Sequence, residues 1–521
     1  MAARQDGVGN GRDSVLLVAT LTSEPTSAEL SSLSTQADVL EVRADLVGDL
    51  EPDRLRRDFS GELLYTLRSE PEGDVGDASK SGERHARLAA AAAGFDLVDL
   101  EAARDLEPAV LESVPPAQRL ISWHGPPTEL GELRSRFDSM QTERARYYKL
   151  VPAAERPVHG LVPLALLASL GRDDVLAFST GPSGFWTRLL APRLGAPVVF
   201  GSAGEQPAAP AQPSIGRLRR DYGLPLLGPV EAVFGLVGNP ALSSLSPRLH
   251  NASYAELGIP SLYLPFEVEA FGDFWLDVVE RGSLGVLGFG LAGLSVTAPF
   301  KEIALAVAGA GSPLADRLGS ANSLVRRGQV WEAESTDGEG VLGPLAEREI
   351  SVEGREAAVV GSGGAGAAAA QALDSLGARV TLVNRSVARG RRTAHGLGIG
   401  FSSLADFDPS VFELLVNATP LGREDGGELP FDIDSIREDA VVVDLAYCAD
   451  RRTHLVEELA GRGVTVVDGR EVLLHQAVRQ FQVMTGQELP VGLGRRVLGL
   501  EGGPVAGFEE GPAASLDGDP A

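Results

Sequence analysis

Eight short apolar runs alternate with segments of helical spacing in the first two fifths of the chain, and this alternation constrains the fold most. The runs occupy residues 15–21, 38–46, 62–68, 96–101, 118–124, 146–151, 175–181 and 197–203. Eight strand–helix units predict an α/β fold whose parallel sheet closes as a (β/α)8 barrel, a TIM barrel, over residues 13–222. A nine-stranded open sheet or a doubly wound fold is the alternative, but eight is the number at which such a sheet closes.

The composition narrows the class of protein. A chain of 521 residues is expected to hold two or three hydrophobic cores. Its formal charge of −26 argues against nucleic acid or an anionic membrane as partner. The lone Cys448 excludes an intramolecular disulfide and fits a reducing compartment. No apolar stretch reaches the ~18 residues of a membrane helix, and the start lacks the apolar core of a secretory signal. We therefore expect a cytoplasmic protein.

Polar side chains gather where the predicted strands end, which is where barrels of this kind build their sites. A structural salt bridge or a solvated loop charge is the alternative for any one of them, but their number favours an active site. They are Glu41, Arg43, Asp45, Arg68, Glu101, His124, Lys149 and, after the seventh strand, Arg188.

Lys149 is the candidate nucleophile. Tyr148 and Leu150 flank it, and partial burial lowers the pKa of an amine, which can then form a Schiff base with a ketone. His124 is the candidate general base or acid, and Glu101 is the group expected to orient its imidazole. The arginines supply a cationic rim for a carboxylate and hydroxyls. The pattern indicates removal of a proton α to an imine, with loss of water from the β position.

These motifs resemble type I 3-dehydroquinate dehydratase over residues 13–222. They are ExRxD at 41–45, TLRSEPEG at 66–73, DLVDLE, SWH, YYKL and STGPSGFWTR. The resemblance implies an imine on Lys149, proton transfer by His124 with Glu101 as acidic partner, and conversion of 3-dehydroquinate to 3-dehydroshikimate. It assigns substrate contacts to Glu41, Arg43, Arg68, Arg188 and Gln212, the last in a closing loop. The chain departs from the family at Ala208, Thr180 and Asp74, which puts the lid contacts in doubt.

The rest of the chain divides further. We expect a linker at 223–232, a substrate domain at 233–336 completed by 471–500, and a nucleotide-binding domain at 337–470. Residues 1–12 and 501–521 lack periodicity and are expected to be disordered tails.

A GxGxxG loop between an apolar strand and an alanine-rich helix predicts a Rossmann-like domain. Its residues are Gly361, Gly363, Gly364, Ala365 and Gly366. Glycines at these positions allow a tight turn and close approach to a pyrophosphate, and an incidental Gly/Ala turn is the alternative. The next strand ends in Asn384, Arg385 and Ser386, with Arg389 one turn on. Arginine there favours a 2′-phosphate and so NADP(H) over NAD(H), although Arg389 is equally readable as a surface charge.

Hydride transfer to a ketone also needs a proton donor, and Lys301 and Asp337 are the candidates. Lys301 follows VTAPF, and Asp337 lies just before the nucleotide domain, so both are expected at the interdomain cleft. Each is also readable as an ordinary surface charge.

Residues 230–500 resemble shikimate dehydrogenase. The motifs are GNPALSSLSPRLHN, GLSVTAPFKE, GSANSL, STDGEG, NATPLG, DLAY and DGREVLLHQA, in the order of that family. The resemblance makes Lys301 and Asp337 the catalytic pair. It assigns the substrate carboxylate to Ser244 and Ser246, the substrate hydroxyls to Thr297, Asn322 and Gln476, and the cofactor side of the cleft to Tyr447, Gly469 and Thr419. Ser243, Ser295 and Ser323 replace other hydrogen-bonding residues, and the serines of SSLSP are alternatively a plain helix N-cap.

Together the two resemblances predict a bifunctional enzyme of aromatic amino-acid biosynthesis. It would dehydrate 3-dehydroquinate and then reduce 3-dehydroshikimate to shikimate with NADPH. No metal is expected, because the histidines are scattered. Two alternatives stay open: a dehydrogenase that prefers quinate with NAD, and a half that is an inactive regulatory module. The sequence leaves the oligomeric state open.

Overall fold

The structure is a computed structural model that describes residues 14–73 and 81–501. The predicted tail 1–12, Asp74 and all but Glu501 of the tail 501–521 lie outside the described residues. The chain divides into two compact units between Glu334 and Ser335. Within the described residues, no helix is long and apolar enough to cross a membrane.

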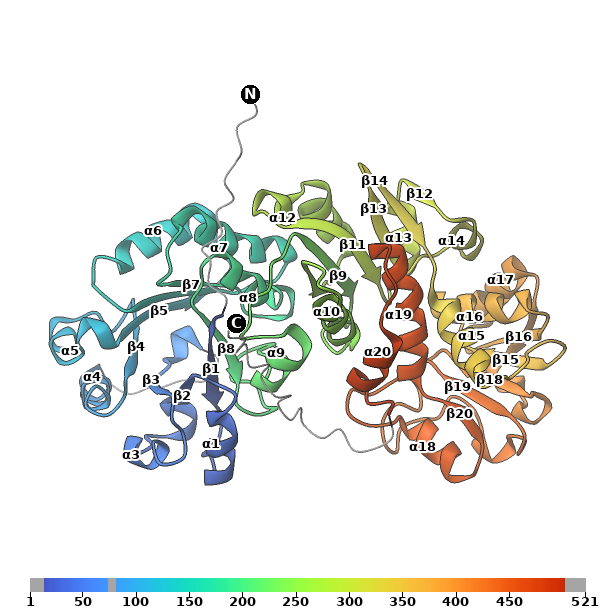
Figure 1. The fold of residues 1–521 in the computed structure, drawn as a ribbon, viewed down its shortest axis with the longest axis horizontal. Coiled ribbons are helices and arrows are strands. Elements are labelled where there is room, and N and C mark those ends of the chain that lie inside the picture. The colour runs from blue at the N-terminus through green and yellow to red at the C-terminus, as the bar shows by residue number, and fades with distance from the viewer. Residues whose placement is uncertain (1–13, 74–80, 502–521) are drawn as a thin grey trace, which may run out of the picture. The chain divides into compact units, whose positions relative to one another are not determined.

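Eight parallel strands form the first sheet, in the order β7-β6-β5-β4-β3-β2-β1-β8 (Figure 1). They are β1 Leu16–Leu21, β2 Val39–Arg43, β3 Glu62–Thr66, β4 Leu97–Glu101, β5 Arg119–Gly125, β6 Tyr147–Pro152, β7 Val175–Ala177 and β8 Val198–Ser202. Because β1 pairs with both β2 and β8, the sheet curls almost into a ring; in the described chain β7 and β8 do not pair. The barrel prediction is confirmed, with one seam left open.

Helices follow the strands around the outside of the barrel (Figure 1). They are α1 Ser27–Ser34, α2 Ala44–Val47, α3 Pro52–Leu55, α4 Ser81–Ala91, α5 Pro108–Ser113, α6 Leu130–Met140, α7 Pro157–Leu170, α8 Thr187–Leu190 and α9 Ile215–Tyr222, with 3₁₀ turns η1 Glu70–Glu72, η2 Pro116–Gln118, η3 Pro182–Gly184 and η4 Ala191–Leu194. Local sequence sets their ends. Thr26 and Glu29 form a capping box at α1, and Gly223, at φ +72°, terminates α9 in the left-handed conformation.

Two residues that the sequence places at strand ends lie elsewhere in the structure. Lys149 is the third residue of β6, which runs on to Pro152, and Arg68 lies two residues beyond β3. The hydrophobic pattern could not locate these ends, because a strand buried on both faces reads as one continuous apolar run.

The linker returns along the start of the barrel. The amide of Val15 donates to the carbonyl of Pro225 at 3.0 Å, and Ser14 forms an antiparallel bridge with Leu226. The chain therefore enters and leaves the barrel at neighbouring points.

A second, mixed sheet completes the first unit, in the order β10-β9-β11-β13-β14-β12. Its elements are β9 Ala232–Gly238, α10 Ser246–Leu257, β10 Ser261–Glu267, α11 Phe271–Phe274, the π-helix η5 Trp275–Glu280, α12 Ser283–Val286, β11 Gly290–Val296, α13 Lys301–Val307, β12 Ala310–Gly311, α14 Pro313–Leu318, β13 Ser323–Arg327 and β14 Val330–Glu334. One continuous hydrophobic core includes buried side chains of both the barrel and this sheet.

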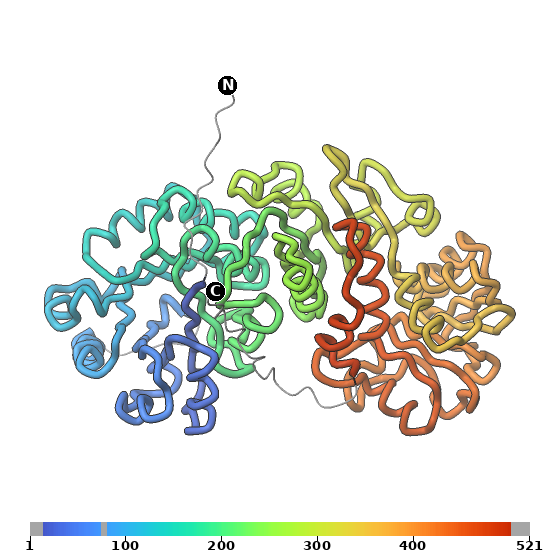
Figure 2. The backbone as a smooth tube through the Cα atoms, viewed as in Figure 1, coloured from blue at the N-terminus to red at the C-terminus, as the bar shows by residue number. Residues whose placement is uncertain are grey.

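The second unit is a six-stranded parallel sheet in the order β17-β16-β15-β18-β19-β20, which Figure 2 traces in yellow to red. Its elements are α15 Asp337–Glu347, β15 Glu356–Val360, α16 Gly364–Ser375, β16 Arg379–Asn384, α17 Val387–Leu397, β17 Gly400–Ser403, η6 Leu404–Asp406, η7 Pro409–Val411, β18 Leu414–Asn417, η8 Ile433–Ser435, β19 Val441–Asp444, α18 His454–Gly461, β20 Thr465–Val467, α19 Gly469–Thr485 and α20 Val491–Val497. This strand order is that of a Rossmann-like domain, as predicted.

Helices α19 and α20, which the sequence assigned to the substrate domain at 471–500, cluster instead with the second unit. Two glycines of α15 explain why: a Cβ on Gly340 would lie 2.7 Å from the carbonyl oxygen of Val472, and one on Gly343 would lie 2.3 Å from the ring of His475. These glycines let α15 and α19 pack at close range. An apolar helix face does not identify its partner by pattern alone.

Candidate active sites

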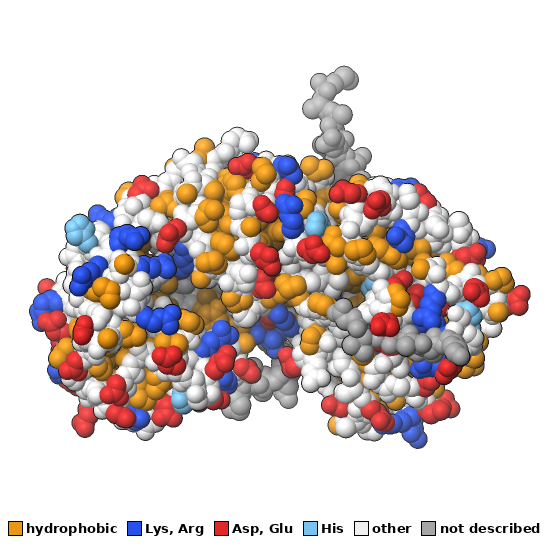
Figure 3. Space-filling view, turned by 180° about the vertical axis from the view of Figure 1, so that it is seen from behind, with side chains coloured by type: hydrophobic (Ala, Val, Ile, Leu, Met, Phe, Trp, Pro, Cys, Tyr) orange, Lys and Arg blue, Asp and Glu red, His pale blue; other side chains and the backbone are white. Residues whose placement is uncertain are grey.

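A cavity of about 710 Å³ opens at the barrel end where the strands finish. Of the eight barrel residues predicted to have a catalytic or substrate-binding role, seven line it: Glu41, Arg43, Arg68, His124, Lys149, Arg188 and Gln212. Glu101 is the exception. Acidic and basic side chains are interspersed on the surface that Figure 3 shows. Because the chain carries a net charge of −26, an anionic substrate would depend on this local group of arginines.

Lys149 is held in apolar surroundings. It is 5% exposed, and its Nζ lies 3.9 Å from the centre of the Phe200 ring. Burial lowers the pKa of the amine, although the carboxylates of Glu41 and Asp99 oppose that shift. The lowered pKa increases the share of neutral, nucleophilic amine in a side chain that lines the cavity.

The carboxylate that contacts His124 belongs to Glu72, and not to Glu101 as the sequence suggested. The Oε2 atom of Glu72 accepts the backbone N–H of His124 at 3.0 Å and lies 3.3 Å from its Nδ1. When Glu72 is ionised, its carboxylate accepts a hydrogen bond from Nδ1, and Nε2 is then the proton acceptor of the ring. Burial lowers the pKa of His124 well below its usual value, with Arg68, Lys149 and Arg43 adding to the shift. Burial also raises the pKa of Glu72 to about 8.

Arg68 occupies a buried carboxylate cluster, and this is where Glu101 is engaged. The guanidinium donates to Asp99 at 2.8 Å and to Glu101 at 3.2 Å. Glu101 also accepts the backbone N–H of Ser69. Burial would lower the pKa of Arg68, but the carboxylates outweigh it and raise that pKa above its usual value. Asp99 and Glu101 are two residues apart on β4, so the alternation of the strand directs both side chains inward, and this spacing is the sequence signal for Asp99.

Glu41 is fixed on the other side of the cavity by hydroxyls. Thr20 and Thr66 donate to its two oxygens at 2.6 and 2.8 Å. Gln212 donates to the hydroxyl of Thr20 at 3.2 Å and accepts the N–H of Ala208 at 3.0 Å. The loop after β8 is thereby joined to β1, and Gln212 lies where the sequence predicted a substrate contact.

Two arginines complete the rim. Arg43 is paired with both oxygens of Asp45, at 2.9 and 2.6 Å. Arg188 donates to the carbonyl of Phe200 at 2.8 Å and lies against the ring of Phe178. Burial lowers the pKa of Arg188 to about 10. Among the described residues no carboxylate contributes to that shift, so an anion entering the cavity would find Arg188 available for pairing.

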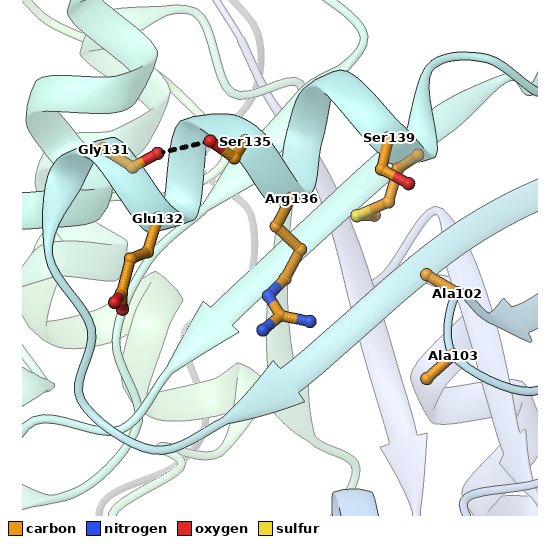
Figure 4. A pocket seen from close by; sticks show the side chains of 8 residues that line it. Ala102, Ala103, Gly131, Glu132, Ser135, Arg136 and Ser139 are labelled. Carbon is orange, nitrogen blue, oxygen red and sulfur yellow. Dashed lines mark hydrogen bonds between the residues drawn. The ribbon is translucent and has the colours of Figure 1, made fainter.

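A second hollow, of about 670 Å³, lies outside the barrel beneath α6 (Figure 4). Arg136 extends from α6 into it and lies 4.2 Å from the Trp123 ring, while Ala102 and Ala103 form the far wall. None of the predicted site residues lines it.

The substrate-domain residues gather at one edge of the second sheet. Ser244 follows β9 and Thr297 follows β11, and these strands are parallel neighbours. Asn322 precedes the antiparallel β13, and its carbonyl accepts the N–H of Val296 at 2.7 Å. The Ser244 hydroxyl donates to that of Ser246 at 3.1 Å. Lys301 begins α13, and its carbonyl accepts the N–H of Ala321.

The nucleotide-loop residues gather where the strand order of the second unit reverses, between β15 and β18. Gly361 has φ +114°, and a Cβ on Gly366 would lie 2.0 Å from the carbonyl oxygen of Gly361. Only glycine fits either position. At Gly363, which caps α16, a Cβ would meet nothing within 4 Å. The open approach to the N-terminus of α16, which begins at Gly364 and Ala365, suits a pyrophosphate.

The other predicted cofactor residues follow neighbouring strands of that sheet. Asn384, Arg385 and Ser386 follow or end β16, and Arg389 lies on α17 with its side chain exposed. Gly469 begins α19, where a Cβ would lie 2.0 Å from the Ala446 carbonyl oxygen. Tyr447 is half-buried after β19, Gln476 is half-buried on α19, and Asp337 is buried at the start of α15.

Thr419 is positioned through a buried chain of polar groups that the sequence analysis missed. Its N–H and hydroxyl both donate to Asn417, at 3.0 and 2.7 Å. Asn417 in turn donates to Asp444 at 2.9 Å, and Thr453 donates to the second oxygen of Asp444. Burial raises the pKa of Asp444 to about 7. In the part of the chain that the structure describes, no cluster of three His, Cys, Asp or Glu side chains could hold a metal ion.

Comparison with known proteins separates the same two halves. Residues 15–225 match the type I 3-dehydroquinase family, and residues 236–324 match the shikimate dehydrogenase substrate binding domain. A shikimate dehydrogenase (NADP(+)) of Halobacterium salinarum is 38% identical over 268 residues, covering 51% of this chain and 98% of that protein. One from Rubrobacter xylanophilus is 36% identical over 283 residues, covering 52% and 96%.

Two solved structures are also similar. The Thermus thermophilus shikimate 5-dehydrogenase in complex with NADP(H) and shikimate is 29% identical, with a TM-score of 0.46, over 52% of this chain and 99% of that one. The S. pombe AroM dehydroquinate dehydratase and shikimate dehydrogenase is 21% identical, with a TM-score of 0.42, over 94% and 98%. Since both TM-scores lie below 0.5, family membership rests on the sequence relatives and family matches.

The fold and its two groups of site residues define an α/β enzyme chain that joins a (β/α)8 barrel to a dehydrogenase with a Rossmann-like domain. The chain belongs to the shikimate dehydrogenase family, and its barrel is a type I 3-dehydroquinase domain.

Proposed function

We propose that the chain catalyses two consecutive reactions: dehydration of 3-dehydroquinate to 3-dehydroshikimate in the barrel, then NADPH-dependent reduction of 3-dehydroshikimate to shikimate by the second half. The observation that carries the first reaction is a buried Lys149 with a lowered pKa, in one cavity with His124 and three arginines. The second rests on family membership and on the glycine loop at the switch point of the Rossmann-like sheet.

In the barrel, the neutral Nζ of Lys149 attacks the substrate ketone, and water leaves as the imine forms. Nε2 of His124 removes the proton α to the imine, while Glu72 stabilises the resulting imidazolium through Nδ1. The electron pair expels the β-hydroxyl, which His124 protonates as it departs as water. Hydrolysis of the imine then releases 3-dehydroshikimate and regenerates the amine. Arg188 is the proposed partner of the substrate carboxylate, with Glu41, Arg43, Arg68 and Gln212 around its hydroxyls.

In the dehydrogenase half, NADPH supplies a hydride when bound. The groups proposed to hold it are Gly361, Gly363, Gly364, Ala365 and Gly366 at the pyrophosphate, and Arg385 and Arg389 at the 2′-phosphate, with Asn384, Ser386, Thr419 and Gly469 beside them. The open N-terminus of α16 supports this fit. Lys301 is proposed to donate a proton to the developing alkoxide, with Asp337 as its acidic partner.

The substrate contacts proposed for this half carry over from the family resemblance. Ser244 and Ser246 bind the carboxylate, and Thr297, Asn322, Tyr447 and Gln476 surround the ring hydroxyls. Ser244, Thr297, Asn322 and Tyr447 lie next to strand ends. Within each unit considered alone, this placement supports their roles, while Ser246 and Gln476 lie on helices α10 and α19. Both reactions are proposed to run in the cytoplasm, and the single Cys448 supports this.

A coupled assay tests both reactions at once. The purified chain, given 3-dehydroquinate and NADPH with no other enzyme, should consume NADPH and accumulate shikimate. Parallel assays start from 3-dehydroshikimate, and from quinate with NAD. Accumulation of 3-dehydroshikimate without NADPH loss would contradict the second activity. Faster NAD-linked oxidation of quinate than NADP-linked oxidation of shikimate would replace the proposed substrate.

A further inference from the structure

The barrel's last helix, α9, packs against α10, the helix that begins at the serines proposed to bind the shikimate carboxylate. At the centre of this contact lies Asp221, which is 3% exposed. Its carboxylate accepts a hydrogen bond from Nε of Arg248 on α10 at 2.8 Å, and its backbone carbonyl accepts one from the side-chain amide of Asn251 at 2.9 Å. Asn251 is bonded in turn to both backbone groups of Tyr263 on β10, so this contact runs from the barrel into the second sheet.

Arg217 extends this contact to the loop that carries the serines. Its guanidinium donates to the carbonyl oxygen of Leu242, two residues before Ser244. The same side chain pairs with Asp221 at 3.5 Å and lies 5.1 Å from the Phe185 ring of the barrel. Three separate barrel and dehydrogenase groups therefore converge on one guanidinium, whose planar fork is suited to several directed bonds.

The loop is held from its other side by its own domain. The amides of Ala241 and Leu242 both donate to Oε2 of Glu267, at 2.9 Å. Glu267 thus fixes the N–H groups of the loop, while Arg217 fixes a carbonyl. The apolar part of the contact, where Trp186 lies 5.5 Å from the Phe266 ring, keeps the two domains in register around this point.

We propose that the dehydratase barrel is part of the shikimate-binding apparatus: Arg217, from the barrel, is a positioning residue that fixes the loop bearing Ser244 and Ser246. This inference rests on the proposed shikimate dehydrogenase activity. Arg217 does not touch substrate; it acts through the Leu242 carbonyl. Its removal should weaken substrate binding and leave proton transfer and cofactor binding unchanged.

The test is Arg217→Met in the full chain, which keeps the length of the side chain and removes every donor. The KM for shikimate should rise about tenfold, since a hydrogen bond to a charged group is lost, while kcat and the KM for NADP⁺ stay within about twofold. Dehydratase kcat should not change. The matched control is Arg219→Met, because Arg219 lies on the same helix but donates to Gln36 within the barrel; it should match the wild type.

Arg217→Lys keeps the charge beside Asp221 but loses the planar fork, so its KM for shikimate should lie between those of the wild type and Arg217→Met. It replaces Arg217→Met as the test if that variant folds poorly. An unchanged shikimate KM in both Arg217 variants, or an equal rise in Arg219→Met, would overturn the proposal. A wild-type chain that oxidises no shikimate would instead overturn the proposed function, and the wild-type assay tells the two failures apart.

Discussion

The two candidate sites are built in opposite ways. The barrel places its charged groups in one cavity of one domain, where Lys149, Arg68 and Glu41 are buried and engaged by neighbouring protein groups. The dehydrogenase half distributes its residues over strand ends of two sheets, in two compact units. Covalent chemistry on a ketone needs a partly desolvated amine, and the buried position of Lys149 in the barrel supplies one. Hydride transfer relies on a bound cofactor, whose pyrophosphate is proposed to lie against backbone groups at glycines.

The small number of lysines relative to arginines bears on the difference between the two sites. Of its 46 lysines and arginines only three are lysines, Lys80, Lys149 and Lys301, and two of these are the proposed catalytic residues. Arginine can bind anions and pair with carboxylates, but it stays protonated and cannot form an imine. Two of the three lysines therefore lie where the proposed chemistry requires an amine that gains and loses a proton.

Lys149→Ala should produce the largest effect. Dehydratase kcat should fall by on the order of 10⁴-fold, because the covalent route is lost, while reduction of 3-dehydroshikimate stays at the wild-type rate. Borohydride with 3-dehydroquinate should add mass at Lys149 in the wild type and none in the variant. Mass on another residue, or a dehydratase rate that survives the substitution, would refute the imine.

Lys301→Met is the reciprocal experiment. Dehydrogenase kcat should drop by about 10³-fold through loss of the proton donor, and the dehydratase rate should be unaffected. Each lysine variant is thus the folding control for the other. A loss of both activities in either variant would show that the two sites are not independent.

Glu72→Gln should change the pH dependence of the dehydratase reaction. The pKa of Glu72 is raised to about 8, so its carboxylate forms as the pH rises through 8 and then stabilises the His124 imidazolium. Wild-type dehydratase kcat/KM should accordingly increase across that range. The Glu72→Gln variant should lack this rise, and its dehydratase kcat/KM at pH 9 should be about 10²-fold below that of the wild type. Glu112→Gln, an exposed change on α5, should keep the wild-type profile; a rise near pH 8 that persists in Glu72→Gln would assign it to another group.

Arg385→Ala should have the smallest effect. Arg385 is exposed at the end of β16, so its pairing with a 2′-phosphate would be partly screened. We expect the KM for NADPH to rise about tenfold with that for NADH unchanged. The control is Arg392→Ala, an exposed position further along α17. Equal changes for the two cofactors would remove Arg385 from the 2′-phosphate site.

The sequence predicted the barrel and the Rossmann-like sheet for two reasons. Both depend on the alternation of strands and helices, and the nucleotide loop has backbone positions that only glycine fits. Gly361 and Gly366 are such positions. It paired His124 with Glu101, whereas the structure pairs it with Glu72, because a 3₁₀ turn carries Glu72 back over the strand ends. Such a turn has no periodicity to read. Helix α19 clusters with the second unit, and the hydrophobic spacing could not indicate this for a related reason: its fit to Gly340 and Gly343 is a matter of shape.

The bond between Val15 and Pro225 has an evolutionary meaning. Because the polypeptide enters and leaves the barrel at neighbouring points, the dehydratase is a self-contained module, and joining it ahead of β9 reroutes no strand of the dehydrogenase. Such a fusion is easily gained, but it is not easily reversed. A descendant that discarded the barrel would also discard Arg217, and would have to evolve another donor for the Leu242 carbonyl.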